Sequence, residues 1–553
     1  MRRKIKISSR FSLFRNRDSG IRPRPWNTVG SRLLGACALL GGIVAASLYL
    51  LGNFVLQPEL NLASPSSQAL LGPSALKGAI FIVKGKQSTL EKAHWKLDGK
   101  NVTEYATING EIGTLNLPSL TEGRHVLIVS SSGSLPWSST DTHWEISVDA
   151  TPPEITVDPE SLSAEHRVPH KVQGFVEPEA TLKLYGKNIP LNKGRFAIEF
   201  SLPPKIPLKF LVEDTVGNQD TLDISISIIP RSSGEPIRGV HVTSNAWADD
   251  TLRNEILTLI DEGLINTVEL DLKDESGGIG YNSNIDFGQE IGAVRGHYDL
   301  AEAIEILHSK NIRVVGRLVV FNDPILAKWA WSEKRRGLVV QTPSGDAYAG
   351  YGGFSNPASK RVRSYNIDIA EEAARYGIDD ILYDYIRRPD GPIETMVFPS
   401  LETTPEEIII QFLKETAERL EPYGTFIGAS VFGIAALRPQ DVAQDIEGMA
   451  EHLDYISPMV YPSHWSADVY DVKDPSNEPY AIVRRSLEDF KAKTAGLGVR
   501  IVPWLQDFSM DVLYGPPEVR AQIEATYDAG LDEWLLWDPR VTYTREALTT
   551  ANP

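Results

Sequence analysis

The fold of this chain is decided by eight short runs: RGVHVTS (238–244), TVELDLKD (267–274), RVVGRLVV (313–320), DILYDYIR (380–387), FIGASVFG (426–433), YISPMVYP (455–462), RIVPWLQDF (500–508) and EWLLWDP (533–539). Each run is rich in β-branched and aromatic residues, which favour strands. Helical patterns lie between them, for example at 251–262, 300–310, 357–376, 405–421 and 517–529. Strands that alternate with helices pair in parallel. Eight such units over about 300 residues predict a (β/α)8, or TIM, barrel.

The carboxyl ends of the predicted strands carry the residues that form the active site in such a barrel. Carboxylates and amides hydrogen-bond to sugar hydroxyls, while aromatic faces stack on sugar C–H faces. We therefore expect a sugar-binding cleft here. Trp504 and Trp534 could instead pack in the core, and we expect this for Trp534. The predicted substrate-binding residues are Lys273, Asp274, Arg387, Tyr461, His464, Gln506, Trp537 and Asp538.

Two carboxylates are the candidate catalytic residues. Asp384 lies between two tyrosines in an otherwise apolar strand, and burying a carboxylate without partners is costly, so it needs either an ion-pair partner such as Arg387 or a functional role. Asp271 lies between two leucines, and strand alternation predicts that it points into the barrel together with Lys273. A structural salt bridge of Asp271 with Lys273 or Arg387 is the alternative. Asp274, Asp507 and Asp538 are reserve carboxylates.

The composition argues against several other functions. Residues 1–32 contain ten basic residues and one acid, so the remaining chain carries a net charge of −27 against −18 for the whole. Such an acidic protein surface repels the phosphates of nucleic acid, so we expect no nucleic-acid binding. The one cysteine, Cys37, lies outside the barrel, and His241 and His464 are the only histidines at the predicted mouth. Their spacing matches no metal motif, so we expect no metal and no cofactor.

The N-terminal region predicts a membrane anchor. Residues 33–56 contain no charged residue, and about 20 apolar residues suffice to cross a bilayer. We expect a basic cytoplasmic tail at 1–32, a transmembrane signal anchor at 33–56, and a single-pass protein of the cell membrane whose later domains are extracytoplasmic. The alternatives are a cleaved signal peptide and a lipoprotein anchored at Cys37.

Two β-sandwich modules are predicted between the anchor and the barrel. A Pro/Ser-rich linker at 57–76 precedes short alternating segments at 77–149, and a second set follows at 150–230. The second set resembles bacterial Ig-like modules in its TPP entry (151–153) and its DTVGN turn (214–218). We expect spacers here. The alternative is a carbohydrate-binding role with Trp137 and Trp144 exposed. The linker RSSGEP (231–236) leads into the barrel domain at 237–553.

The barrel motifs taken together resemble a known family. RGVHVTS, VELDLKDESGGIGY, ILYDYIRRP, DYISPMVYPSHW, PWLQDF and GLDEWLLWDP occur in the order found in the bacterial glycoside hydrolase-like TIM-barrel family DUF4015. The likeness covers about residues 237–545 and implies glycosidase activity. The family's usual strand 4 ends in FDYVRFP. Asp384, Arg387 and Pro389 match that pattern, whereas Arg388 replaces an aromatic residue and is expected to change a subsite.

These features together predict a membrane-anchored glycoside hydrolase that cleaves a polysaccharide with two carboxyl groups, Asp384 and Asp271. The rival hypothesis is a non-catalytic carbohydrate-binding or cell-envelope scaffold protein. We expect the polysaccharide and the membrane as partners, with no nucleic acid and no obligate protein partner.

Overall fold

The computed structural model describes residues 29–50, 59–132 and 139–549. Its C-terminal part is a closed barrel of eight parallel strands, because β19 pairs with both β20 and β29. A two-residue strand, β27 (Arg500–Ile501), comes just before β28, the seventh strand of the barrel, and pairs with β26. The predicted TIM barrel is confirmed. Its strands are β19 (Arg238–Val242), β20 (Thr267–Lys273), β23 (Arg313–Val319), β24 (Asp380–Asp384), β25 (Phe426–Phe432), β26 (Tyr455–Met459), β28 (Trp504–Gln506) and β29 (Trp534–Trp537).

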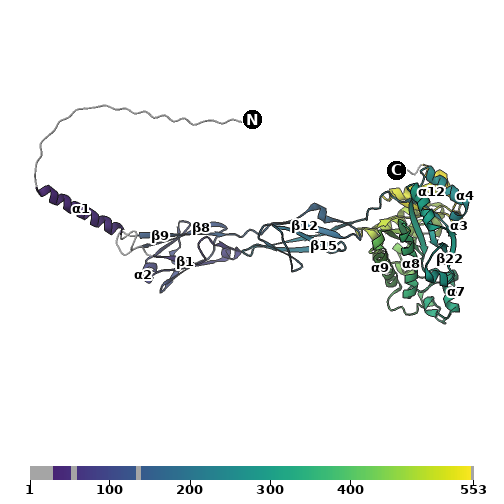
Figure 1. Cartoon of the computed structure of the whole chain (residues 1–553), viewed down its shortest axis with the longest axis horizontal. Helices are drawn as coiled ribbons and strands as arrows, with labels where there is room; N and C mark the ends of the chain where they lie inside the picture. The colour runs from purple at the N-terminus through teal and green to yellow at the C-terminus, as the bar shows by residue number, and fades with distance from the viewer. Residues whose placement is uncertain (1–28, 51–58, 133–138, 550–553) are drawn as a thin grey trace, which may run out of the picture. The chain divides into compact units, whose positions relative to one another are not determined.

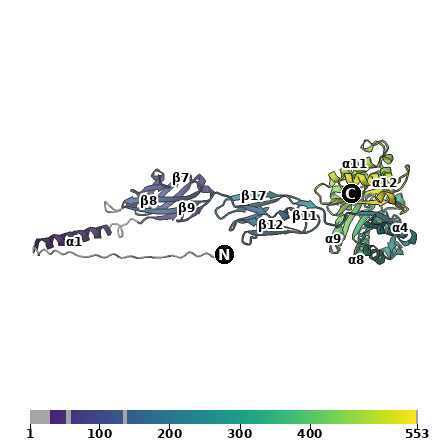
Figure 2. The ribbon, with the colours of Figure 1, turned by 90° about the horizontal axis from the view of Figure 1, so that it is seen from above.

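Helices surround the barrel (Figures 1 and 2). Their apolar faces pack on the strands, and the helix α9 begins with a capping box in which Thr404 and Glu407 bond to each other's backbone N–H groups. The main helices are α4 (Asp250–Asp261), α6 (Leu300–Ser309), α7 (Pro324–Ser332), α8 (Lys360–Arg375), α9 (Pro405–Leu420), α11 (Pro479–Thr494) and α12 (Pro516–Asp528). Shorter ones are α3 (Ser244–Ala248), α5 (Asp286–Glu290), α10 (Ile446–Ala450) and α13 (Arg545–Leu548).

The chain departs from simple strand–helix alternation after β20. Strand β21 (Ile279–Tyr281) pairs antiparallel with β20, and β22 (Val294–Tyr298) extends this pairing outside the barrel. The pairing of β20 with β23 also shifts by one residue between Asp271 and Lys273. Such a bulge reverses the alternation of the side chains beyond it, which determines where Lys273 points.

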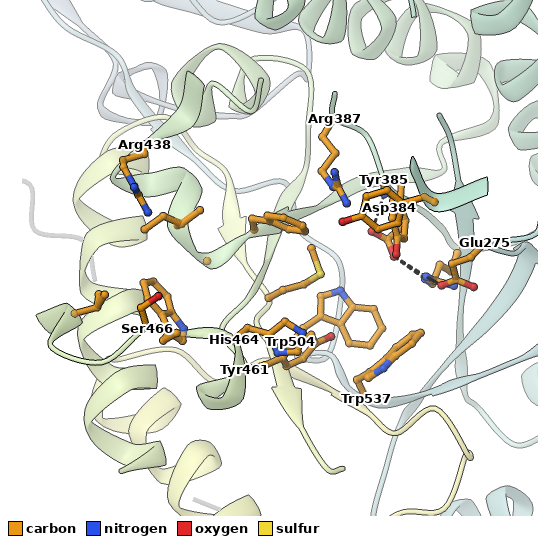
Figure 3. Close-up of a pocket in the computed structure, with 18 residues that line it drawn as sticks. Glu275, Asp384, Tyr385, Arg387, Arg438, Tyr461, His464, Ser466, Trp504 and Trp537 are labelled. Carbon is orange, nitrogen blue, oxygen red and sulfur yellow. Dashed lines mark hydrogen bonds and ion pairs between the residues drawn. The ribbon is translucent and has the colours of Figure 1, made fainter. Parts of the chain in front are cut away.

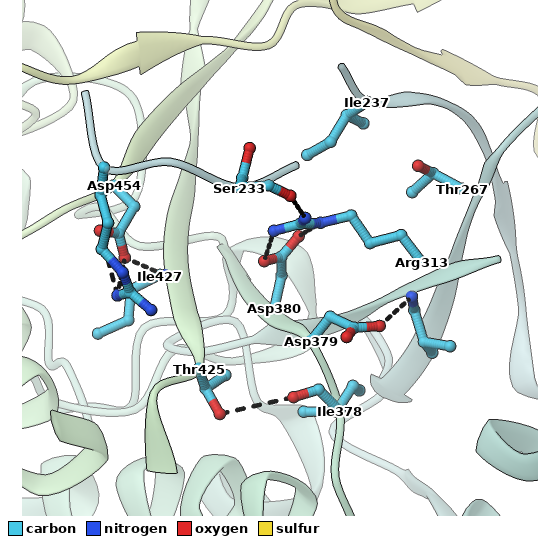
Figure 4. A network of polar contacts seen from close by, with 12 residues as sticks. Ser233, Ile237, Thr267, Arg313, Ile378, Asp379, Asp380, Thr425, Ile427 and Asp454 are labelled. Atoms are coloured by element: carbon cyan, nitrogen blue, oxygen red, sulfur yellow. Dashed lines mark hydrogen bonds and ion pairs between the residues drawn. The ribbon is translucent and has the colours of Figure 1, made fainter. Parts of the chain in front are cut away.

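A polar network holds the amino ends of the strands (Figure 4). Arg313 donates to both carboxylate oxygens of Asp380, at 2.7 and 2.6 Å, and to the carbonyl of Ser233, at 2.6 Å. The Asp379 carboxylate accepts a bond from the backbone N–H of Val314 at 2.8 Å. Charged groups at this end therefore secure the strands and the preceding linker, at the opposite end from the predicted active site.

Two β-rich modules precede the barrel. In the first, two sheets enclose a core that includes Phe81, Trp95 and Trp144. One sheet contains β1 (Asn61–Ser64), β3 (Ala79–Lys84), β7 (Ile112–Leu117) and β6 (Ala106–Asn109). The other contains β2 (Leu70–Leu71), β9 (Ser139–Val148), β8 (Gly123–Ser132), β4 (His94–Leu97) and β5 (Lys100–Asn101). Trp144 is thus buried rather than exposed for sugar binding, and Trp137 lies outside the described residues.

The second module has three small sheets around a core that includes Val172, Phe196 and Phe210. They contain β10 (Ile155–Val157), β12 (His170–Val176) and β15 (Arg195–Phe200); β14 (Lys187–Ile189), β13 (Thr181–Leu184), β16 (Leu208–Glu213) and β17 (Gln219–Ile224); and β11 (Ser163–Glu165) with β18 (Ser227–Ile229). The described chain forms two compact units, and Glu154–Val212 belongs to the same unit as the barrel. The Ig-like assignment stays a prediction.

The predicted transmembrane helix is corrected. Among the helices of the described residues, none is both long and apolar enough to cross a membrane. The helix α1 (Val29–Leu50) begins before the predicted span and includes Arg32, and 51–56 lies outside the described residues.

Candidate active site

A pocket of about 480 Å³ opens at the carboxyl ends of the barrel strands. Its walls come from seven of the eight strands or the loops that follow them (Figure 3). Of the predicted residues, Asp384, Arg387, Tyr461, His464 and Trp537 line it. The structure therefore brings together half of the ten predicted site residues. The further lining residues used below are Glu275, Arg317, Tyr351, Tyr385, Phe432, Arg438 and Trp504.

Arg317 links the carboxylates at the floor of the pocket. Its Nε and Nη2 donate to Oδ2 of Asp384, at 3.0 and 2.6 Å, and its Nη1 donates to Oδ1 of Asp271 at 2.8 Å. The same Nη2 also bonds to Oε1 of Glu275. Although burial opposes the charged form, these carboxylates raise the pKa of Arg317 well above its ordinary value. One buried cation therefore holds three carboxylates in place.

Asp384 is the last residue of β24 and is only 7% exposed. Its Oδ1 accepts the backbone N–H of Tyr385 at 2.7 Å, while Oδ2 faces Arg317. Tyr385 has a φ of 49°, in the left-handed region, which turns the chain sharply at this point. Asp384 is thus presented to the pocket by the strand end and is fixed at both of its oxygens.

Asp271 lies beneath the pocket rather than in its wall. It is buried, and its Oδ1 bonds to Nε2 of His241 at 3.0 Å as well as to Arg317. Burial raises the pKa of Asp271, but His241 and Arg317 outweigh burial and bring it below its ordinary value. The ring of His241 stacks on Trp537, with centroids 4.0 Å apart. Asp271 is therefore held as an anion that orients Arg317 and His241.

Aromatic rings form one wall of the pocket. Trp504 and Trp537 meet edge to face at 5.5 Å, and Nε1 of Trp504 donates to the Ser430 hydroxyl at 3.0 Å. Tyr461 meets the ring of His464 at 5.3 Å. Burial lowers the pKa of His464, so this imidazole is neutral at pH 7. Trp534, by contrast, lies in the packed core. Aromatic side chains from β26, β28, β29 and the loops after them therefore line this side of the pocket.

The placement of Lys273 differs from the prediction. The bulge in β20 turns its side chain into the helix layer, where Nζ pairs with Oδ2 of Asp323 at 2.7 Å and donates to Asn366 of α8 at 3.1 Å. Lys273 is fully buried, and its remaining bonds go to backbone carbonyls of β23 and the residue after it. It is placed as a structural cation rather than as a substrate ligand.

Four other predicted carboxylates and amides also lie outside the lining. Asp274 accepts bonds from Ser276 and Gly278, and so shapes the loop that carries Glu275. Gln506 is buried and accepts the Ser463 hydroxyl at 2.9 Å, which anchors the loop of His464. Asp507 accepts the backbone N–H and the hydroxyl of Thr544, and Asp538 accepts the backbone N–H of Arg540 at 2.6 Å.

Sequence reasoning missed Glu275 and Arg317. A signal for Arg317 was present, because it is a cation between apolar residues within a strand, and the strand register places it opposite Asp271. Strand alternation points Arg317 toward the lumen, as it does Asp271. Glu275 lies in a loop without periodicity, so only the fold brings it to the pocket.

No group of three or more His, Cys, Asp or Glu residues within the described ranges is arranged to hold a metal ion. His241 is committed to Asp271 and Trp537, whereas His464 lies on the outer wall, where its Nδ1 meets the Ser463 hydroxyl at 3.1 Å.

Two further hollows adjoin the pocket and share lining residues with it. One, on the side of the loop after β24, shares Phe432 and Ile434 and includes Arg388. The other shares Tyr461, His464 and Trp537. The mouth of the barrel is therefore wider than a single sugar site.

Three solved structures are similar to parts of this chain. A hypothetical protein from Ruminiclostridium thermocellum ATCC 27405 is 33% identical over 34% of this chain and 96% of its own, with a TM-score of 0.31. The PgaB (BpsB) glycoside hydrolase domain from Bordetella bronchiseptica is 14% identical over 57% and 99%, with a TM-score of 0.43. The Group II chitinase catalytic domain 2 from Ostrinia furnacalis is 14% identical over 57% and 94%, with a TM-score of 0.36.

Sequence comparison identifies the family. No curated protein matches the chain. The model of the family DUF4015, described as "Putative glycosyl hydrolase domain", matches residues 239–543. This match covers the barrel strands from the second residue of β19 to the end of β29, and all residues that line the pocket described above. The chain therefore belongs to the DUF4015 glycosyl hydrolase family.

Proposed function

We propose that the barrel hydrolyses a polysaccharide, with Asp384 and Glu275 as its two carboxyl groups. The observation that carries this proposal is that both carboxylates line the aromatic-walled pocket and bond to the same nitrogen, Nη2 of Arg317. Because they share one nitrogen, their nearest oxygens lie within about 5 Å of each other. Carboxyl groups this close fit retaining glycosidases, in which they lie about 5–5.5 Å apart, better than inverting enzymes, which leave a wider gap for water.

The surroundings of the two carboxylates favour different roles. Asp384 is deep and is fixed by Arg317 and by its own backbone, as suits a nucleophile that attacks the anomeric carbon. The Glu275 side chain is 41% exposed, so it can exchange protons with solvent. In this scheme Glu275 protonates the leaving oxygen while Asp384 forms the glycosyl ester. Glu275 then takes a proton from the water that cleaves this ester.

Asp271, predicted as the catalytic partner of Asp384, takes a different part in this proposal. It is buried below the pocket and contacts Arg317 and His241. We assign it the task of positioning Arg317, which in turn orients Asp384 and Glu275.

The size of the barrel mouth supports a polymeric substrate. Hollows on both sides of the pocket share Phe432 on one side and Tyr461 and Trp537 on the other. Sugar units on either side of the cleaved bond could occupy them, with rings stacked on the aromatic faces. The proposal includes a location of the barrel outside the cytoplasm, because envelope polysaccharides lie outside the cytoplasm. Protease added to intact spheroplasts should therefore digest the barrel.

The test is release of reducing sugar by the full-length protein from a panel of envelope and matrix polysaccharides. Wild type should release sugar from at least one of them, and the first product should keep the anomeric configuration of the substrate, as followed by NMR. Asp384→Asn and Glu275→Gln should abolish release. Asp261→Asn and Glu488→Gln, two exposed carboxylates on α4 and α11, are matched controls that should retain it.

The rival hypothesis predicts a different result. A non-catalytic carbohydrate-binding or scaffold protein would bind glycans without releasing sugar, and Asp384→Asn would leave its behaviour unchanged. Product of inverted configuration would contradict the roles given to Asp384 and Glu275.

A further inference from the structure

We infer that the glycan bound in this pocket carries a negative charge, which Arg387 receives. The inference rests on the proposed function and names the class of its substrate: a polysaccharide with acidic groups. It is carried by a buried arginine that lines the pocket and retains N–H groups for a ligand.

Aromatic rings hold Arg387 in place without using its N–H donors. The residue is 2% exposed. Its guanidinium carbon lies 4.4 Å from the ring centre of Phe432, 4.8 Å from that of Tyr385 and 5.3 Å from that of Tyr351. Such contacts stabilise a cation through the ring faces. The guanidinium is therefore pre-oriented, and it points into the pocket (Figure 3).

The protein satisfies Arg387 only in part. Its Nη1 donates to the carbonyl of Arg388 at 3.0 Å and to Oδ1 of Asp390 at 3.3 Å, and the Tyr351 hydroxyl also interacts with its side chain. Asp390 is a weak partner, because its side chain is 48% exposed and also accepts the Tyr351 hydroxyl at 2.5 Å. A guanidinium has five N–H donors, so those of Nε and Nη2 can serve a ligand in the pocket.

Two of the arginines that line the pocket are not committed to its carboxylates. Three arginines and two carboxylates line the pocket, although the whole chain carries −18. Arg317 already bonds to both lining carboxylates and to Asp271. Among the described residues, the ion pair of Arg438 is an exposed one, with Asp441 at 3.4 Å. The carboxylate partners of Arg387 and Arg438, Asp390 and Asp441, are about half exposed and lie outside the pocket lining. Because solvent weakens such ion pairs, these two arginines can bind an anion in the pocket.

Arg388 provides a further cation in the adjoining hollow. It is 6% exposed and donates to the carbonyls of Pro389, Gly391 and Gln440. Among the described residues it forms no ion pair within 4.0 Å, so its charge is not neutralised by direct contact. The position that departs from the family pattern thus places a second buried cation beside Arg387.

The ligand chemistry follows from the geometry of the guanidinium. A planar fork of N–H donors matches the two oxygens of a carboxylate, and it also accepts sulfate or phosphate. We therefore expect uronic acid carboxylates or sulfated or phosphorylated sugars at this position, and the experiment below distinguishes these sources.

Binding is measured on the full-length Asp384→Asn protein, so that no polymer is cut. The probes are polygalacturonate, alginate and hyaluronan in affinity electrophoresis, each compared with its own carboxyl-reduced, neutral form. At least one acidic polymer should bind about tenfold more tightly than its reduced form, as expected for one charge-assisted contact. Dextran sulfate and dextran phosphate, each compared with dextran, form the second arm and identify a sulfate or phosphate ligand.

Arg387→Met in the same background should remove the preference for the anionic polymers. Methionine keeps the apolar stem among the aromatic rings and leaves Asp390 exposed to solvent, so the fold should survive. Arg387→Lys keeps the charge but loses the planar set of N–H donors, so it should retain only part of the preference. This variant tests the inference if Arg387→Met fails to fold. Arg484→Met on α11 is the matched control and should change nothing.

The inference is overturned if no anionic polymer binds more tightly than its neutral counterpart, or if the preference persists without Arg387. Sugar release by wild type is assayed separately. Release only from neutral glycans would overturn the inference and leave the proposed function standing. Binding of acidic glycans that depends on Arg387, without any sugar release, would overturn the proposed function and support the binding of an acidic glycan at Arg387.

Discussion

At the scale of single residues, the pocket depends on how Arg317 distributes its bonds. Its guanidinium contacts Asp271, Glu275 and Asp384 at once. Removing one carboxylate leaves two others on the cation, so the buried charge stays paired. Single substitutions of these carboxylates should therefore separate chemistry from stability.

Asp384→Asn should lower turnover by at least about 100-fold, which corresponds to about 2.7 kcal/mol of transition-state stabilisation. The amide keeps the shape of the side chain but cannot act as a nucleophile. The melting temperature should change little, because Arg317 retains Asp271 and Glu275. Kinetics and thermal unfolding are measured on the same preparation. An active but destabilised variant would make Asp384 a structural partner instead.

Asp507 should make the stability of the protein depend on pH. Burial raises its pKa to about 7, even though Thr544 donates two hydrogen bonds to it. The unfolded chain releases this proton near pH 4, whereas the folded protein retains it until about pH 7. The contribution of this group to stability is therefore present below pH 4 and is lost as the pH rises to about 7.

Asp507→Asn should remove this loss. The free energy of unfolding of the variant, relative to wild type, should rise between pH 4 and pH 7 by up to a few kcal/mol and then level off. Chemical denaturation at a series of pH values measures it, with Asp261→Asn as the exposed control. A difference that does not change with pH would mean that Asp507 is ionised in the folded protein.

At the scale of elements, the bulge in β20 decides which side chains reach the pocket. Before it, Asp271 points toward the lumen and bonds to Arg317; after it, Lys273 points into the helix layer and pairs with Asp323. The pKa of Asp323 is raised by burial despite Lys273. The pair thus joins β20 to the segment before α7 in a region that excludes water.

Lys273→Met should destabilise the barrel by up to about 3–5 kcal/mol, because it leaves a buried carboxylate without its cation. Protonation of Asp323 can reduce this cost at low pH. Turnover per folded molecule should stay within a few-fold of wild type, since Lys273 does not line the pocket.

The double variant Lys273→Met/Asp323→Asn should recover part of the stability, because it removes the unpaired charge while the amide oxygen can still accept the Leu326 N–H at the start of α7. If Lys273→Met instead reduced turnover strongly at unchanged stability, Lys273 would belong to the active site after all. Denaturant titration and kinetics on both variants decide between these outcomes.

At the scale of the whole molecule, the second β module and the barrel share charged contacts. Arg167 of the module donates to Oδ2 of Asp454 at 2.8 Å, and Arg231 of the linker lies 3.5 Å from the same oxygen. Asp454 is buried at the start of β26 and also accepts the Ile427 N–H. The barrel closes on itself, so it should fold without the module, but at reduced stability.

A fragment of residues 237–553 should unfold cooperatively at a temperature several degrees below that of 154–553, because it lacks both arginine partners of Asp454. Arg167→Met in the longer fragment should reproduce part of this difference, whereas Lys171→Met, on an exposed pair with Glu199, should not. Equal melting temperatures of the two fragments would show that these contacts contribute nothing. Differential scanning calorimetry measures all four proteins.

The sequence by itself determined the barrel and the position of Asp384. Strand runs and helical repeats are local patterns, and the order of eight units leaves few ways to bury their apolar faces. Asp384 was identified because a carboxylate within an apolar strand is costly wherever the strand lies. Arg387, Tyr461, His464 and Trp537 followed from their places at strand ends.

The tertiary structure alone decided the partners of these residues. Glu275 comes from an irregular loop, and its bond to Arg317 joins residues 42 positions apart. A one-residue bulge moved Lys273 out of the lumen, which alternation within one strand does not reveal. A local sequence pattern predicts neither the N–H groups that Arg387 keeps for a ligand nor the two carboxylates that share Nη2 of Arg317. Hydrogen bonds depend on distances between segments that are remote along the chain, and only the closed barrel sets those distances.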